Sequence, residues 1–128
     1  MVTARRSKRF TQSPTELWKR MGGWGTIHDW HPAVASTEVS ADGSLRTLTL
    51  ADGATLVERL MGQDEHSYSY AFVEAPLPVK DYRATIRVRP DEAGSMVEWE
   101  GTFSAAGISD PEAVALIEGI YQAGLDAL

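Results

Sequence analysis

The sequence contains no cysteine, so it can form neither a disulfide framework nor a thiolate site, and a reducing compartment, the cytoplasm, is expected. No apolar run approaches the roughly 20 residues that a membrane-spanning helix needs, so we expect no integral membrane contact. Basic residues are outnumbered: 12 Lys and Arg against 18 Asp and Glu give a net charge of −6. This balance argues against nucleic acid or an anionic membrane as the main partner.

Several catalytic signatures are also missing. There is no Gly-x-Ser-x-Gly nucleophile elbow, and the glycine-rich segment 22–25 has neither a preceding strand nor the lysine of a phosphate-binding loop. The segment 28–31, His-Asp-Trp-His, offers two histidines and a carboxylate, but His66 stands alone and no second cluster completes a metal site. We therefore expect no metal and no cofactor.

What is present fits one globular domain over residues 1–128, with 43% hydrophobic and 23% charged residues. Its last stretch, 110–128, predicts a long helix with Asp110 as N-cap and Pro111 at the first helical position. At about 1.5 Å per residue this helix would be roughly 28 Å long. One apolar face is marked by residues at helical spacing: Val114, Ile117, Tyr121, Gly124, Leu125 and Leu128.

The N-terminal part predicts one strand and two short helices. Residues 2–11 favour an exposed first strand whose basic residues guard its edge, although a basic arm for a polyanion is an alternative. A capping box with proline at the first helical position starts a helix at Ser13, which ends at Gly22. A second short helix is expected over residues 24–30.

From Ala33 onward the hydrophobic period becomes two. Turn residues separate six runs, which predict an antiparallel meander with strands near residues 33–39, 44–50, 54–61, 67–74, 80–89 and 95–104.

In the last hairpin, pairing Arg89 with Met96 places Ile86 opposite Trp99 on the inner face and Arg87 opposite Glu98 on the outer one. Because one register satisfies both faces, the hairpin is well supported. An Arg87–Glu98 ion pair would be a surface contact worth at most about 1 kcal/mol.

The hairpin around Asp52 predicts a charge pair on the apolar side of the sheet. A three-residue loop, 51–53, with glycine in the left-handed region keeps the alternation in phase and sets Arg46 directly opposite Glu58. Buried charges must be paired or functional, because burying one alone costs several kcal/mol. Two hypotheses stay open: an interior salt bridge that fixes strand register, and a polar anchor for a ligand at the floor of a cavity.

Aromatic residues form a second set on inner faces, comprising Tyr68, Tyr70, Phe72, Tyr82, Trp99 and Tyr121. Ordinary core packing explains most of them. Inward tyrosine hydroxyls nevertheless need partners, which could be each other, water or a bound molecule.

The order of elements resembles the helix-grip fold of the START-like or SRPBCC superfamily. Several segments together are similar to the bacterial polyketide cyclase/dehydrase and lipid-transport family. In chain order they are residues 13–18, 29–32, 46–48, 52–53, 58–60, 75–79, 81–82, Trp99, Phe103 and 124–125. The unusually basic first strand departs from the family pattern.

The resemblance implies an α+β fold in which a curved antiparallel sheet of about seven strands wraps a long C-terminal helix, with a mostly apolar cavity between them. It implies that residues 75–79 form a loop at the cavity mouth. Taken with the inner-face pattern, it predicts these ligand-binding residues: Trp30, His31, Arg46, Leu48, Leu56, Glu58, Tyr70, Tyr82, Trp99 and Tyr121.

Three functions follow as hypotheses. The first is binding of a small hydrophobic molecule, lipid or polyketide-like, by a monomer or homodimer. The second is a cyclase or dehydratase in which Glu58 or His31 acts as acid or base and Arg46 or a tyrosine stabilises an enolate. The third is an interaction module whose aromatic residues fill its core. A raised pKa at Glu58 would favour catalysis, whereas a low one would indicate a structural pair.

Overall fold

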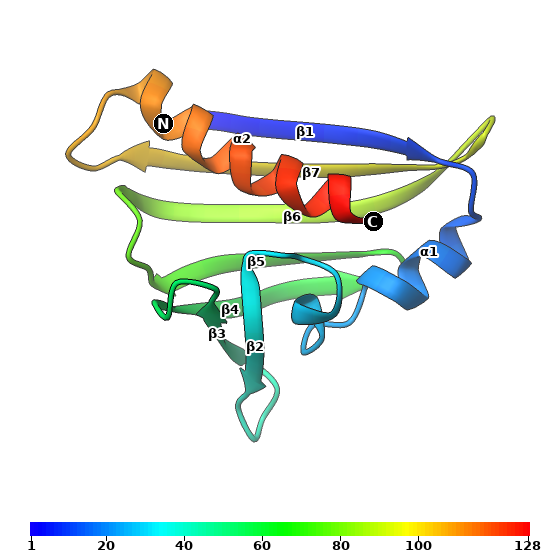
Figure 1. Ribbon diagram of the computed structural model, residues 1–128, viewed down its shortest axis with the longest axis horizontal. Helices are drawn as coiled ribbons and strands as arrows, with labels where there is room; N and C mark the ends of the chain where they lie inside the picture. Colours follow the sequence, from blue (N-terminus) through cyan, green and yellow to red (C-terminus); the bar gives the residue numbers. More distant parts are fainter.

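The computed structural model describes residues 1–128 as a strongly curved, seven-stranded antiparallel sheet with one long helix lying across its concave face (Figure 1). The strands are ordered β1-β7-β6-β5-β4-β3-β2. This arrangement confirms the predicted α+β helix-grip architecture. The elements are β1 (Val2–Phe10), α1 (Pro14–Met21), η1 (Ile27–Asp29), β2 (Val34–Val39), β3 (Leu45–Leu50), β4 (Thr55–Asp64), β5 (Ser67–Glu74), β6 (Val79–Asp91), β7 (Gly94–Ala105) and α2 (Asp110–Ala127).

Strand β1 is added beside β7, the last strand of the meander, and forms one edge of the sheet (Figure 1). Its basic side chains meet carboxylates of β6, β7 and α2. The ion pairs are Arg5–Glu100, Arg6–Glu118, Lys8–Asp126 and Arg9–Asp91. Because the chain itself supplies these partners, the edge-strand interpretation is favoured over a free basic arm.

Both predicted hairpin registers are confirmed. Arg89 pairs with Met96 and Ile86 with Trp99 in the β6–β7 hairpin. The expected ion pair is wrong in one detail: Glu98 Oε1 lies 2.8 Å from Nε of Arg89, its diagonal neighbour, instead of contacting Arg87. Diagonal neighbours on one face of a sheet are within reach of a long arginine side chain.

The β3–β4 loop also has the predicted form. The Leu50 N–H donates to the Ala54 carbonyl at 2.8 Å, and Gly53 adopts a φ of 92°. Only glycine takes this left-handed conformation without strain. The three-residue loop therefore keeps Arg46 opposite Glu58.

Two helix predictions need correction. Helix α2 begins after Ser109, not Asp110, because the Ser109 hydroxyl accepts from the Glu112 N–H while the Glu112 carboxylate accepts from the Ser109 N–H. This is a reciprocal capping box. The second short helix is only the single 3₁₀ turn η1. Three of the residues 22–25, just before η1, are glycines. Because glycine disfavours a regular helix, no longer helix forms there.

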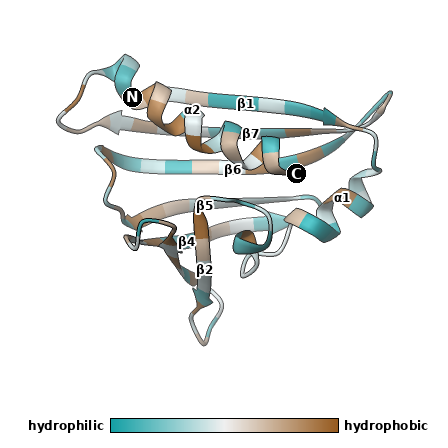
Figure 2. Cartoon of the chain, viewed as in Figure 1, coloured by the Kyte–Doolittle hydropathy of each residue, from teal (hydrophilic) through white to brown (hydrophobic).

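Helix α2 covers only one half of the sheet. It packs mainly against β1 and β7, as its position in Figure 1 shows. Hydrophobic and hydrophilic residues alternate along its turns (Figure 2), and the buried side includes Ile117, Tyr121 and Leu125. The concave surface of β3, β4 and β5 is therefore left partly uncovered by the helix. No helix is both long enough and apolar enough to cross a membrane.

Candidate functional site

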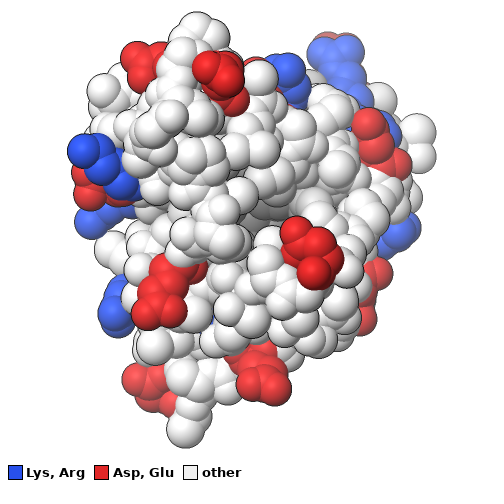
Figure 3. Space-filling model, turned by 60° about the vertical axis from the view of Figure 1, so that its left-hand side comes forward, with Lys and Arg blue, Asp and Glu red and all other residues white.

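A cavity of about 270 Å³ lies between α2 and the part of the sheet that the helix leaves uncovered. Most of the residues that line it are hydrophobic. The two most exposed, Ala51 and Asp52, belong to the β3–β4 loop, and Leu77 comes from the β5–β6 loop. Figure 3 shows the side of the molecule that carries these loops: uncharged atoms surround a hollow, with acidic side chains around them.

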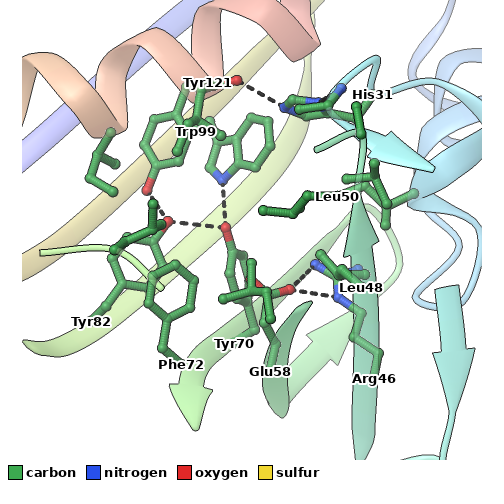
Figure 4. A pocket seen from close by; sticks show the side chains of 18 of the residues that line it. His31, Arg46, Leu48, Leu50, Glu58, Tyr70, Phe72, Tyr82, Trp99 and Tyr121 are labelled. Carbon is green, nitrogen blue, oxygen red and sulfur yellow. Dashed lines mark hydrogen bonds and ion pairs between the residues drawn. The ribbon is translucent and has the colours of Figure 1, made fainter. Parts of the chain in front are cut away.

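Arg46 and Glu58 meet at one end of the cavity (Figure 4). Both Nε and Nη2 of Arg46 lie 2.7 Å from the same carboxylate atom, Oε1 of Glu58. Arg46 Nη1 also donates to the Trp24 carbonyl at 2.9 Å and to the Tyr68 hydroxyl at 3.3 Å. The guanidinium lies 4.0 Å from the centre of the Trp24 ring. These contacts fix Arg46 from several sides.

Glu58 is only 3% exposed, and burial raises the pKa of its carboxyl, while the neighbouring Arg46 opposes that rise. Its second oxygen, Oε2, receives no hydrogen bond from the protein. Oε2 is also not among the fully buried polar atoms that lack a partner, so it keeps some accessible surface, and Glu58 lines the cavity. The site therefore presents one carboxylate oxygen without a hydrogen-bond partner to a mostly apolar space.

Three tyrosine hydroxyls and one indole form a chain of hydrogen bonds at the other end of the site (Figure 4). The Trp99 indole N–H donates to the Tyr70 hydroxyl at 3.1 Å, which lies 3.1 Å from the Tyr82 hydroxyl. Tyr82 in turn bonds to the Tyr121 hydroxyl. Burial raises the pKa of all three phenols, so each keeps its proton.

Flat aromatic surfaces form part of the cavity wall. The Trp99 and Tyr121 rings stack with centres 4.5 Å apart, and the Phe72 and Tyr82 rings stack at 3.9 Å. Each of these four residues lines the cavity.

His31 uses both ring nitrogens within the protein. Nε2 lies 2.9 Å from the Ile120 carbonyl of α2, and Nδ1 accepts from the Ala33 N–H at 3.2 Å. These partners assign the proton to Nε2. Burial lowers the pKa of His31, which stabilises the neutral ring. As an acid or base, His31 would first have to break one of these bonds, whereas Glu58 has a free oxygen.

Every residue predicted to bind a ligand lines the cavity except Trp30. The Trp30 ring packs instead against Trp99, with centres 5.8 Å apart, and beneath Gly124 of α2. Ligand contact by the other residues stays a prediction.

Further lining residues come from positions that the sequence pattern placed in the core or left unassigned. They include Ile27, Val34, Leu50, Phe72, Leu77, Ile117 and Ile120. Ile117 and Leu50 could have been predicted from the sequence. Ile117 lies on the same apolar helix face as Tyr121, and Leu50 lies on the same strand face as Leu48. Ile120 could not, since it lies beside the apolar stripe of its helix.

The histidines do not form a metal site. His28 faces Thr37, with Nδ1 2.9 Å from the hydroxyl, while His31 points to α2. No three histidine, aspartate or glutamate side chains converge in a group that could hold a metal ion.

Comparison with known proteins gives a consistent family. The family model described as polyketide cyclase/dehydrase and lipid transport matches residues 1–128. The solved structure of XoxI from Bacillus cereus is 38% identical, covers 99% of this chain and 92% of its own, and has a TM-score of 0.95. The MLP-like protein 423 of Arabidopsis thaliana is 32% identical over an alignment of 91 residues. The alignment covers 63% of this chain and only 59% of that protein. Ara h 8.0201 shares the fold, with a TM-score of 0.70 at 19% identity over 95% of this chain and 93% of its own.

Proposed function

The chain belongs to the polyketide cyclase/dehydrase and lipid-transport family, and from that membership we propose that it binds one small hydrophobic molecule in the cavity beside α2. The observation that carries this proposal is the cavity itself, which is mostly apolar and contains a single buried ion pair. Such cavities, apolar with a few oriented polar groups, are typical of small-molecule sites. An interaction module with a filled core would have no such space.

The test is native mass spectrometry of the purified protein, followed by denaturing extraction of any molecule that it carries. Leu56→Trp places a large ring at a buried lining position. Val73→Trp, at an exposed position of β5, is the matched control. We expect a co-purifying or added apolar molecule to be lost in Leu56→Trp and retained in Val73→Trp.

Two results would contradict binding in this cavity. One is equal retention of the molecule by both tryptophan variants. The other is a wild-type protein that carries nothing and shows no melting shift across a panel of hydrophobic compounds.

A second candidate function is acid–base catalysis of the cyclase or dehydratase kind. It is favoured by Glu58, whose burial raises its pKa and whose Oε2 is open to the cavity. A carboxylate so placed can remove a proton next to a substrate carbonyl, while a tyrosine hydroxyl donates to the developing enolate oxygen.

Substitution of Glu58 distinguishes a binding protein from an enzyme. If the protein is an enzyme of this kind, Glu58→Gln should lower turnover of the extracted compound class by about 100-fold or more. If it is a binder, the wild type returns the compound unchanged. The assay is product analysis by mass spectrometry after incubation of the protein with the compound.

A further inference from the structure

The tyrosine chain has one more hydrogen than it can use. Tyr70, Tyr82 and Tyr121 supply three hydroxyl hydrogens, but only two contacts join their oxygens. The Trp99 indole can only donate, so it consumes an acceptor and accepts nothing. Whichever way the chain is directed, one O–H hydrogen is left without an acceptor in the protein.

At the ion pair an acceptor is left open toward the cavity. Arg46 Nε donates to Oε1 of Glu58, and Oε2 receives nothing from the protein. Arg46 Nη2 also lies 2.7 Å from Oε1 but has no hydrogen-bond partner, and it is sealed among protein atoms where a ligand cannot reach it. An ionised carboxylate is only an acceptor. Burial raises the pKa of Glu58, and the Arg46 cation 2.7 Å away opposes that rise by stabilising the ionised form. Glu58 is 3% exposed, so the open oxygen meets the cavity and not bulk water.

One O–H hydrogen of the tyrosine chain and Oε2 of Glu58 therefore both lack a partner in the protein, and the residues that carry them line the same cavity. Buried polar groups without partners are costly, and most native structures pair them. Glu58 lies on β4 and Tyr70 on the adjacent strand β5, and both line the cavity together with Tyr82 and Tyr121. One molecule can contact both the open carboxylate oxygen and the tyrosine chain.

We propose that the cavity selects a compact, flat molecule with a hydroxyl or N–H that donates to Glu58 Oε2 and a carbonyl oxygen that accepts from the tyrosine chain. This inference rests on the proposed binding function and specifies its ligand class. Glu58 is then the residue that distinguishes a free hydroxyl from its methyl ether.

Size and shape support the compact class. An apolar cavity of about 150 Å³ accommodates benzene, and this one measures about 270 Å³. It suits a body of one or two rings better than a long acyl chain. The stacked pairs Trp99–Tyr121 and Phe72–Tyr82 provide flat walls.

Three probes of similar size separate the two polar requirements. Para-hydroxyacetophenone has both the hydroxyl and the carbonyl, para-methoxyacetophenone has lost the donor, and para-ethylphenol has lost the carbonyl. We expect the first to bind the wild-type protein at least about tenfold more tightly than either of the others, because each analogue leaves one buried group unpaired. Isothermal titration calorimetry measures the three dissociation constants.

Two variants should remove one preference each. Glu58→Gln presents an amide in place of the acceptor oxygen, so the preference for hydroxyl over methyl ether should fall to within about threefold while the preference for the carbonyl stays. The triple variant Tyr70→Phe, Tyr82→Phe, Tyr121→Phe should lose the carbonyl preference and keep the hydroxyl preference. The wild-type comparison needs no variant, so a variant that fails to fold leaves the test intact.

The outcomes distinguish this inference from the binding function. If the wild type binds all three probes within about threefold of one another, the donor–acceptor pairing is wrong and binding stands. The compact class is wrong if no probe binds although a larger apolar molecule is lost in Leu56→Trp. If neither the probes nor any extracted molecule binds, both proposals fail.

Discussion

The guanidinium of Arg46 and the carboxylate of Glu58 are buried together, and neither has another charged partner there. Arg46 is 1% exposed and Glu58 3%, on adjacent strands that both face the cavity. Removing one member of such a pair leaves an uncompensated buried charge, which lowers stability more than removing both members does. We therefore expect the pair to favour this register of β3 against β4, whether or not a ligand also uses Glu58.

Glu58→Ala should lower the free energy of unfolding by about 3–5 kcal/mol, because it leaves the buried charge of Arg46 without a partner. The control is Glu98→Ala, which removes the exposed partner of Arg89 and should cost less than about 1 kcal/mol. Urea unfolding followed by circular dichroism measures both. Equal losses in the two variants would show that the buried charge is solvated after all.

At the scale of an element, α2 carries two glycines in very different surroundings. A Cβ at Gly119 would meet open space, whereas one at Gly124 would lie 2.6 Å from Cδ2 of His31 and 3.0 Å from Trp30. The His31 ring is held by hydrogen bonds on both nitrogens, so it cannot easily move aside. The glycine at 124 is thus required for the close approach of the helix to residues 30–31.

Alanine substitution at these two positions should change stability in opposite directions. Gly119→Ala should raise the free energy of unfolding by up to about 1 kcal/mol, from helix propensity alone. Gly124→Ala gains the same propensity but overpacks the contact with His31, and we expect a net loss of about 1 kcal/mol. Chemical denaturation of the two variants in parallel is the measurement, and stabilisation by both would show that the His31 contact yields freely.

The elements differ in how well the sequence predicted them, and the difference has a physical basis. Strand register was predictable because a slip of one residue turns every side chain to the other face. Alternation together with the length of the turn therefore predicted the pairs Arg46–Glu58 and Ile86–Trp99. The start of α2 was not, since Ser109 and Asp110 are both good caps and only the reciprocal bonds with Glu112 decide between them.

The cavity wall was partly predictable for the same reason. Inner-face phase identified Tyr70, Tyr82 and Trp99, which all line it. Trp30 was predicted from the family resemblance and not from phase, and its ring packs against Trp99 instead of lining the cavity. The alternation of side chains along a strand does not predict individual hydrogen bonds. Only the structure shows that Oε2 of Glu58 has no hydrogen-bond partner.

At the scale of the whole molecule, His31 connects the sheet to the helix. Through Nε2 it holds the Ile120 carbonyl of α2, and through Nδ1 it accepts from the Ala33 N–H just before β2. The strand and the helix that flank the cavity are joined here by a neutral imidazole. Protonation of Nδ1 would remove its ability to accept, so acid should weaken this connection.

The pH dependence of stability tests this connection. Burial lowers the pKa of His31 below the value of about 6.5 that it has in the unfolded chain. Between the two values the unfolded chain binds a proton that the native protein does not, so the free energy of unfolding should fall as pH drops below about 6.5. Glu58 acts in the opposite sense, because its raised pKa lets the native state bind a proton more readily than the unfolded chain. We therefore compare wild type with His31→Gln, in which the Glu58 contribution cancels. The stability advantage of the wild type should shrink on acidification in urea titrations, whereas curves that stay parallel would mean that His31 titrates alike in both states.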